Sequence, residues 1–475
     1  MHVLAQGLAV LATASLVVPG FARTPSNAWD ESETIFIRAG RVIVQPGEEL
    51  SNVSILVEDG TIRGIGADLA APEGARMLEA DVVCAGFFDA WATVGLSSDV
   101  VRDGATTAAT RTADGVAPED DDHVIEEALR SGVTFARVQA GAAAKVSGIG
   151  SILRLDPQGD RDDVLLLADA NVAVNVGMSV SGGAPAVQIV SLAGSARAMD
   201  PFDRIAEVNR MIGALDAGEK YLLDQTEYKH ELEEWLKTIA EKEEELEKDF
   251  KKAKKSRDKK KEEAEEKGKE FKEKRYKEDK KPKAPKYNED SEVMARVVNG
   301  ELPLVVQAHR WAELRALLEG TAKFDRLRLI VAGGTEALGH ADELAERGIP
   351  VLLWPAPLGA DARPDEYESH DLALAGRLAE AGVSVLIGSG GYRAEASRDL
   401  PLLASLAIGH GLDREAAFEA LTVGAAEAFD VADRVGTVER GKDADLLLLN
   451  GQPLMATTRV LYVIAGGRVV VTPEN

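Results

Sequence analysis

Six polar residues lie at or near the ends of apolar segments of this sequence, and their types suit acid–base or nucleophilic chemistry. They are Asp89, Arg137, His309, Arg310, Glu336 and Ser389. A carboxylate or an imidazole can move protons, a serine hydroxyl can attack a carbonyl, and arginine can bind an anion. The alternative is that they are ordinary polar residues at strand ends. Both interpretations stay open, and no catalytic set is assigned.

Histidine is the side chain that most often binds a catalytic metal, and the chain has seven histidines. Only His309 directly follows an apolar run, Leu304–Ala308, and precedes a helical segment. A catalytic zinc ion needs about three protein donors, so one histidine cannot hold it. We therefore predict no metal ligands and no cofactor from these residues.

The candidate nucleophiles lack the sequence context that activates them. Ser389 is not part of a G-x-S-x-G nucleophile elbow, and Ser147–Ser151 does not match that motif either. Cys84, the only cysteine, lies in an apolar run and is expected to be a buried core residue that forms no intrachain disulfide. Gly182-Gly183 and Gly333-Gly334 do not form a phosphate-binding loop motif.

Apolar segments that alternate with helical ones would position the six residues. The predicted strands are Phe87–Val94, Thr134–Gln139, Val172–Val176, Leu304–Ala308, Leu327–Val331, Val351–Trp354 and Val383–Ser389. The predicted helices include Trp311–Leu318, Glu336–Arg347, Leu372–Ala381 and Arg414–Leu421. Repeated strand–helix units predict parallel strands joined by crossovers, and this many units favour a closed α/β barrel. Its active site would lie at the carboxyl ends of the strands.

Both ends of the chain contain short strands that would form a second, smaller domain. Residues 34–82 include a hairpin signal at Asp59-Gly60, and residues 435–475 have the same strand-rich texture. We therefore expect a β-domain built from 34–82 and 435–475, with the barrel spanning 83–434.

The segment Cys84–Leu96 resembles the first barrel strand of the amidohydrolase superfamily, which reads Pro-Gly-Phe-Ile-Asp-x-His-x-His-x-Gly. Gly86, Phe87, Phe88, Asp89 and Gly95 match, whereas Ala85 replaces the proline. Gly441-Lys-Asp-Ala-Asp-Leu-Leu447 also resembles the closing segment of the family, and the resemblance extends from Ile35 to Val470 apart from the insertion. The nearest branch is the imidazolonepropionase-like and dihydroorotase-like one. The resemblance implies a TIM-like (β/α) barrel of the metal-dependent hydrolase type with a small β-sandwich built from both chain ends.

The same resemblance locates departures at the positions of the metal ligands. Trp91 and Thr93 stand where the family has its first two histidines, and Gly390 stands where it has a catalytic aspartate. The sixth-strand segment Ile330–Ala337 has no histidine, although Glu336 follows that strand. Indole has no lone pair for a metal, threonine is a poor transition-metal ligand and glycine has no side chain.

These departures lead to three functional hypotheses. The family resemblance implies hydrolysis of non-peptide C–N bonds with a divalent metal such as zinc. Because several ligand positions are lost together, we expect a degenerate metal site and a catalytically silent family member. One alternative is an active hydrolase with an unusual pocket around His309 and Glu336. The other is a non-catalytic partner of an intact amidohydrolase.

Residues 219–286 form a charged insertion that is expected to be helical, because Glu, Lys, Leu and Ala dominate it. A heptad-like seam runs through Leu232, Leu236, Ile239, Leu246, Phe250 and Ala253. The segment is either a solvated charged helix or frayed hairpin, or a coiled-coil arm for dimerisation, and these interpretations stay open.

The net charge of −25 is unevenly distributed. Residues 219–286 carry 23 Lys and Arg against 21 Asp and Glu, which leaves 32 basic and 59 acidic residues elsewhere. An acidic body argues against nucleic acid and anionic membranes as partners. A small-molecule ligand, a homo-oligomer or a pairing with a related amidohydrolase remain as expected partners.

The N-terminus resembles a secretory signal. Residues 1–22 contain a mostly apolar run from Val3 to Val18, followed by Pro19-Gly20-Phe21-Ala22 with small residues near the expected cleavage point. We therefore predict a periplasmic or secreted protein that has no membrane attachment after cleavage.

Overall fold

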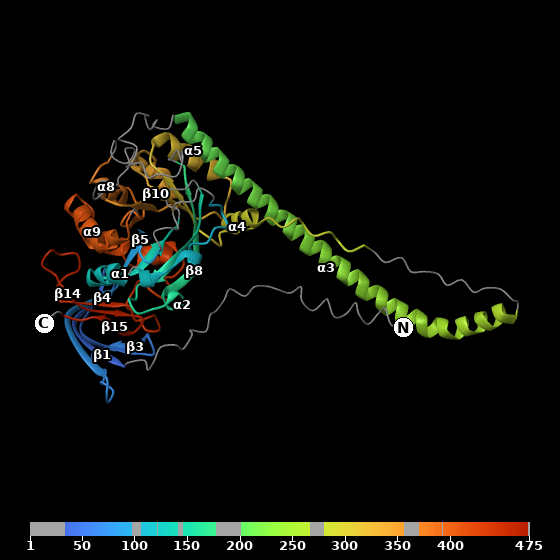
Figure 1. Ribbon diagram of the computed structural model, residues 1–475, viewed down its shortest axis with the longest axis horizontal. Helices are drawn as coiled ribbons and strands as arrows, with labels where there is room; N and C mark the ends of the chain where they lie inside the picture. The colour runs from blue at the N-terminus through green and yellow to red at the C-terminus, as the bar shows by residue number, and fades with distance from the viewer. Residues whose placement is uncertain are drawn as a thin grey trace.

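The computed structural model describes residues 34–96, 106–120, 122–140, 146–176, 201–266, 280–355, 370–391 and 393–473. The described chain forms a body of two β-sheets covered by helices, and one long helix projects from it (Figure 1). The predicted signal at residues 1–22 lies outside the described residues, as does 267–279 of the insertion.

The larger sheet is an eight-stranded, nearly closed barrel, as predicted. Its strands are β5 (Phe87–Ala92), β6 (Val133–Val138), β7 (Val146–Arg154), β8 (Leu165–Asn175), β9 (Leu304–Ala308), β10 (Leu329–Gly333), β11 (Val351–Leu353) and β12 (Val385–Ile387), paired in sequence order. The first and last strands meet where the Gly390 amide donates a hydrogen bond to the Trp91 carbonyl at 3.1 Å. The carboxyl ends of the parallel strands therefore lie around one mouth.

The expectation that all barrel strands run parallel is wrong at β7. This strand pairs antiparallel with both β6 and β8, while the remaining pairs are parallel. Its sequence, Val-Ser-Gly-Ile-Gly-Ser-Ile-Leu-Arg, contains two glycines. The described residues between β6 and β7 include no helix, so β7 lacks the strand–helix signature. β8 is also longer than the predicted Val172–Val176, because it starts at Leu165.

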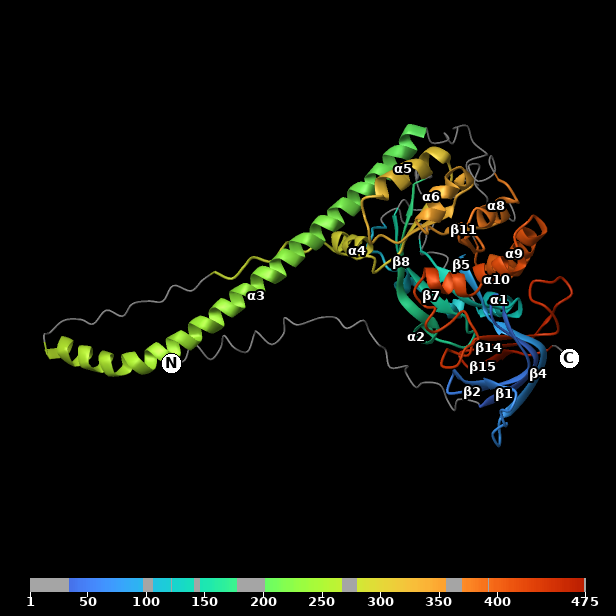
Figure 2. The same cartoon turned by 180° about the vertical axis from the view of Figure 1, so that it is seen from behind.

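Helices cover the outside of the barrel (Figure 2). They are α1 (Asp122–Arg130), α2 (Arg161–Val164), α4 (Glu289–Val298), α5 (Trp311–Thr321), α6 (Ala341–Glu346), α8 (Leu374–Glu380), α9 (Leu400–Gly409), α10 (Arg414–Ala420) and α11 (Val423–Ala428), with short 3-10 turns at Thr112–Gly115, Pro118–Asp120, Ala337–His340 (η5) and Ala394–Asp399 (η6). Inside the barrel, Phe88 packs against Phe135 and stacks on Phe429, with ring centroids 5.9 and 6.2 Å apart. None of the described helices combines the length and the apolar character needed to cross a membrane.

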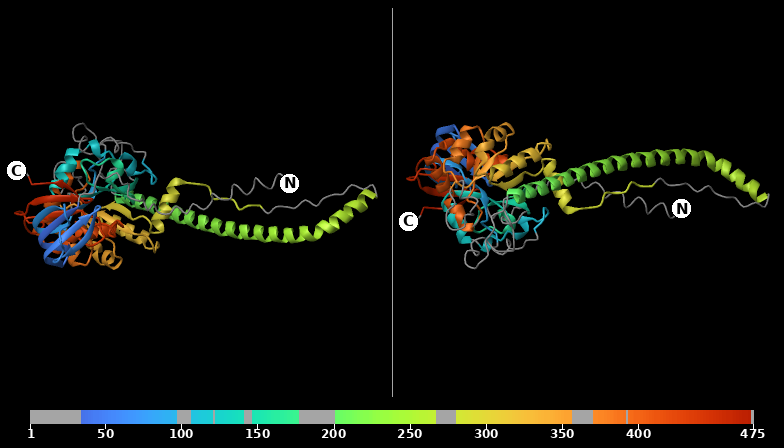
Figure 3. Two further views of the ribbon diagram at one scale, coloured as in Figure 1. Left: turned by 90° about the horizontal axis from the view of Figure 1, so that it is seen from below. Right: turned by 90° about the horizontal axis from the view of Figure 1, so that it is seen from above.

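The β-domain is one curled sheet made from both chain ends (Figure 3). Its strands are β1 (Ile35–Gln45), β2 (Glu48–Glu58), β3 (Thr61–Gly66), β4 (Arg76–Ala85), β13 (Leu446–Leu449), β14 (Val460–Ala465) and β15 (Arg468–Val471), in the order β15-β14-β13-β4-β1-β2-β3. A bridge between Thr61 and Asp443 brings the β3 edge back to the chain before β13. The sheet thereby encloses its own apolar core.

The segment that resembles the closing motif attaches this domain to the barrel. Asp445 is buried and accepts two hydrogen bonds from the Arg154 guanidinium of β7, at 2.9 and 3.1 Å. Asp443 accepts a third from Arg154 at 2.5 Å. A bidentate arginine–carboxylate contact is both strong and directional, so the motif has a structural role.

The charged insertion continues a helix that begins in the body. α3 (Pro201–Glu266) is a single 66-residue helix, and Val208, Met211 and Leu215 near its start are buried against the barrel. Beyond these residues it leaves the body as an arm (Figure 1). Along the arm, a stripe of half-buried residues runs through Leu232, Trp235 and Ile239, whereas Leu236 of the predicted seam is more exposed.

Candidate functional site

Asp89 forms the first group of predicted site residues, together with Ser389. The Asp89 Oδ1 atom accepts hydrogen bonds from the backbone amides of Trp91 and Ser389, at 3.1 and 2.9 Å. Its Oδ2 atom accepts one from the Ser397 hydroxyl at 2.8 Å. Burial raises the pKa of Asp89 to about 6, and these hydrogen bonds limit the increase. Asp89 thus joins the first barrel strand to the segment after the last one.

Arg137 of β6 is the largest fully buried side chain of the body. Its Nε donates to Asn171 Oδ1 at 2.9 Å, and a second nitrogen donates to Gln139 Oε1 at 2.7 Å. The guanidinium carbon lies 4.6 Å from the Trp91 ring centroid, within the range of a cation–π contact. Burial lowers the pKa of Arg137 to about 9, and the negative charge of Asp89 opposes this change. The barrel interior therefore contains a protein cation.

Trp91 fills the end of β5 and is almost fully buried. A Cβ atom added at Gly388 would lie 2.7 Å from the Trp91 Cβ, and one added at Gly391 would lie 2.3 Å from the indole nitrogen. Both contacts are shorter than atoms tolerate. Gly388 makes room for the backbone and Cβ of residue 91, whereas Gly391 makes room for the indole itself. The tryptophan after Asp89 and the glycines after β12 therefore form one packing unit.

His309 follows β9, as predicted, and its ring is buried inside the barrel. A Cβ atom at Gly333 of β10 would lie 2.3 Å from the imidazole Cε1, so the ring lies directly on the backbone of that strand. Glu313 of α5 accepts a hydrogen bond from the His309 amide at 2.9 Å and forms a buried ion pair with Arg204 of α3 at 2.6 Å. The first turn of α5 and the base of α3 together fix the position of His309.

Arg310 and Glu336 form an ion pair beside His309, with 3.2 Å between a guanidinium nitrogen and Glu336 Oε1. The other carboxylate oxygen of Glu336 accepts a hydrogen bond from the Trp311 amide at 2.6 Å. The Glu336 amide also donates to the His309 carbonyl at 2.9 Å. Glu336 is thus close to His309 through the backbone, while its carboxylate caps α5 and neutralises Arg310.

Two tryptophans connect the groups around Asp89 and His309. Trp354, which follows β11, has its ring centroid 5.8 Å from that of Trp91 and 6.0 Å from that of His309. The structure therefore brings all six predicted residues to one end of the barrel, in two groups separated by aromatic rings. Among the described residues, no three His, Cys, Asp or Glu side chains come close enough together to hold a metal ion.

Sequence reasoning missed several residues that line this interior. They are Gln139, Asn171, Asn175, Gln307, Trp354 and Ser397, and all are buried. A signal for two of them exists in β8, where Asn171 and Asn175 interrupt an apolar strand four residues apart and so face the same side. The contribution of Ser397 has no comparable signal, because its partner Asp89 is 308 residues away in sequence.

Replacing Ser397 with alanine tests the group around Asp89. The variant loses a buried hydrogen bond to a carboxylate, so we expect it to lose about 1.5–3 kcal/mol of unfolding free energy above pH 6. Below pH 5 the loss should be smaller, because Asp89 is then protonated. Urea denaturation at both pH values measures the difference, and Ser405→Ala on α9 is the matched control, since its hydroxyl bonds carbonyl oxygens. Equal losses of unfolding free energy at both pH values would show that the Ser397 hydroxyl does not stabilise the ionised form of Asp89.

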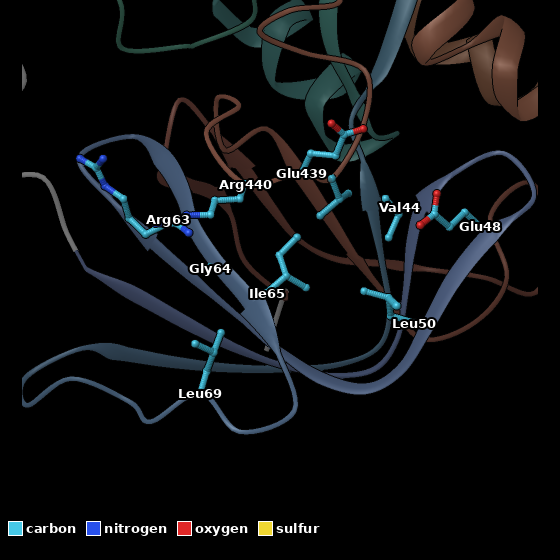
Figure 4. A pocket seen from close by; sticks show the side chains of 10 residues that line it. Val44, Glu48, Leu50, Arg63, Gly64, Ile65, Leu69, Glu439 and Arg440 are labelled. Atoms are coloured by element: carbon cyan, nitrogen blue, oxygen red, sulfur yellow. The ribbon is translucent and has the colours of Figure 1, made fainter.

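A separate groove lies on the β-domain (Figure 4). It has a volume of about 550 Å³, with Val44, Leu50 and Ile65 among its apolar lining residues and Arg63 and Glu439 among its charged ones. All its lining residues come from 44–69 and 438–440, so the groove is not part of the barrel mouth.

Known structures share this fold. An amidohydrolase from Thermotoga maritima MSB8 superposes with a TM-score of 0.65 and 21% sequence identity, covering 92% of this chain and all of the other. The A. niger ochratoxinase gives a TM-score of 0.51 at 15% identity, covering 94% of this chain and 97% of the other. At these identities the similarity establishes the fold alone.

Sequence comparison identifies the family. An imidazolonepropionase from Porphyromonas gingivalis is 32% identical over 169 residues, which are 34% of this chain and 37% of that protein. One from Thermoanaerobacter pseudethanolicus is 31% identical over 121 residues, 25% of this chain and 29% of that protein. The chain thus matches about a third of the length of these curated relatives. The model of the amidohydrolase family matches residues 82–470, most of the chain. The chain therefore belongs to the amidohydrolase family.

Proposed function

We propose that this protein keeps the amidohydrolase fold but does not hydrolyse C–N bonds with a divalent metal. The packing of Trp91 carries the proposal. Its indole occupies a position where the family has a histidine ligand, and it packs on Arg137 and against Gly391. An indole offers a metal no lone pair, and a buried guanidinium beside it would repel a second cation.

The other ligand positions support the same proposal. Thr93 follows Trp91, Gly390 replaces the aspartate, and His309 is a single imidazole enclosed by Gly333 and Trp354. The residues present therefore do not fit a zinc site, which needs about three protein donors around one ion. We propose that the interior of the barrel mouth is held together by Arg137 and the aromatic rings.

The competing hypothesis, an unusual hydrolase centred on His309 and Glu336, has less support. The Glu336 carboxylate bonds to Arg310 and the Trp311 amide, which gives it a structural role in the turn. A general base must reach the proton that it removes. Hydrolysis of cyclic amides that is abolished by His309→Ala would favour this hypothesis over the silent one.

Metal binding by the purified full chain tests the proposal. We expect elemental analysis after incubation with Zn²⁺ or Mn²⁺, followed by desalting, to give far less than one ion per chain. A metal-loaded amidohydrolase handled in parallel is the control for loss during desalting. Added Zn²⁺ should leave the melting temperature unchanged, whereas a resident ion at 100 times its Kd stabilises by about 2.7 kcal/mol. About one bound ion per chain that is lost in His309→Ala would overturn the proposal.

Export remains a separate proposal that rests on residues 1–22. Its support is the apolar run and the small residues near Ala22. Cleavage after Ala22, measured by mass spectrometry of the protein from the periplasm or medium, is the expected result.

A further inference from the structure

The arm of α3 has a described apolar stripe along one side. Tyr228, Leu232, Trp235 and Ile239 are half-buried, and the residues between them are mostly exposed. Their spacing of four, three and four residues places them on one face of a helix, as in a two-stranded coiled coil. Leu246 and Ala253 continue the same spacing along the helix.

The charges of the arm are divided along its length. Residues 219–250, next to the body, carry 12 acidic and 5 basic residues. Residues 251–261, further out, carry 8 basic residues and one acidic. The rest of the chain outside 219–286 has a net charge of −27, since its 59 acidic residues face 32 basic ones.

We propose that two copies of this chain pair through their arms in antiparallel orientation. Each basic outer segment then lies beside the acidic inner segment of the other arm and points toward the acidic body of that copy. Parallel pairing would bring like charges together, which is unfavourable. Direct contact between the two acidic bodies would also be unfavourable, so the arms supply the interface. The proposal is independent of the loss of the metal site.

The length of the arm is sufficient for such an interface. Residues 219–266 of α3 form an unbroken helix, which at 1.5 Å per residue extends about 70 Å. A symmetric antiparallel overlap of these residues crosses near Lys242. The same surface then occurs twice in the interface, which is the property of a closed two-fold dimer.

Charge reversal tests both the occupant and the orientation. The first variant carries Lys251→Glu, Lys252→Glu and Lys254→Glu; the second carries Glu231→Lys, Glu233→Lys and Glu234→Lys. We expect wild type to be dimeric by light scattering, and each variant alone to dissociate with a Kd about tenfold higher or more. A mixture of the two variants should form a heterodimer, because opposite charges again face each other. Equal helix content by circular dichroism confirms that both variants are folded.

Some outcomes would overturn the proposal. A monomeric wild-type chain at low ionic strength contradicts it directly. A mixture of the two variants that stays monomeric would also contradict it, because opposite charges then face each other in the proposed arrangement without restoring the dimer. Dimers unaffected by either variant would locate the interface elsewhere.

Cross-linking distinguishes the two orientations. Cys84 is the only cysteine in the sequence and it is buried. A cysteine introduced on the arm is therefore the thiol that a cross-linker reaches. Lys242→Cys should give a covalent dimer with a short bismaleimide. Leu223→Cys should not, because antiparallel arms hold the two copies about 60 Å apart at that position. Efficient cross-linking of Leu223→Cys would indicate parallel arms and overturn the proposal.

Discussion

Replacing Arg137 with methionine is expected to lower the free energy of unfolding by about 3–5 kcal/mol, the cost of removing one partner from a buried charged network. The substitution removes the hydrogen bonds to Asn171 and Gln139, and the cation–π contact with Trp91. It also leaves the buried carboxylate of Asp89 without the positive charge that faces it. Chemical denaturation at pH 7 measures the loss.

Two further substitutions separate the reasons for this loss. Arg111→Met removes a half-exposed ion pair with Asp169 on the outside of the barrel, and surface pairs contribute only about 0–1 kcal/mol. Arg137→Lys keeps the charge but loses the planar guanidinium that reaches two acceptors. Its loss of unfolding free energy should therefore lie between those of Arg137→Met and Arg111→Met. If Arg137→Met destabilises no more than Arg111→Met, the buried arginine does not hold the barrel interior together.

The second large effect is the pH dependence that Asp89 gives to stability. Its pKa is about 6 in the folded protein, against 3.8 as the ordinary value, because burial disfavours the charged form. Stabilisation by this group is therefore complete below about pH 4 and is lost as the pH rises through 6. A shift of this size corresponds to roughly 3 kcal/mol at 1.36 kcal/mol per pH unit.

Asp89→Asn isolates this contribution, since asparagine resembles the protonated acid in shape and charge. Wild type minus variant stability should fall by roughly 2 kcal/mol between pH 4 and 6.5, most of the full effect. Urea titrations of both proteins across this range provide the measurement, and other titrating groups cancel in the difference. Parallel profiles would show that Asp89 keeps an ordinary pKa in the folded state.

The buried charges of Arg137 and Asp89 distinguish this barrel mouth from a metal centre. A divalent cation at a barrel mouth is a large local charge around which carboxylates and imidazoles are arranged. Here the buried positive charge belongs to Arg137, and one carboxylate, Asp89, is close enough to influence its pKa. We infer that the hydrogen-bonded Arg137 guanidinium and the aromatic rings stabilise this end of the barrel.

Much of the fold followed from local patterns in the sequence. Leu304–Ala308 is a strand with the predicted bounds, and α5 and α10 begin at their predicted residues, Trp311 and Arg414. Short apolar runs followed by amphipathic helices are readable because each signal spans neighbouring residues. β7 escaped because an antiparallel strand without a crossover helix looks like a glycine-containing loop.

For the site, the sequence by itself determined which side chains are present and therefore which chemistry they lack. Trp91, Thr93 and Gly390 are poor metal ligands in any fold. Only the tertiary structure decided why these changes are compatible with each other. Trp91 packs against Gly388 and Gly391, some 300 residues later, and it covers Arg137 from another strand. Such contacts depend on how strands close into a barrel, and short-range patterns carry no information about that closure.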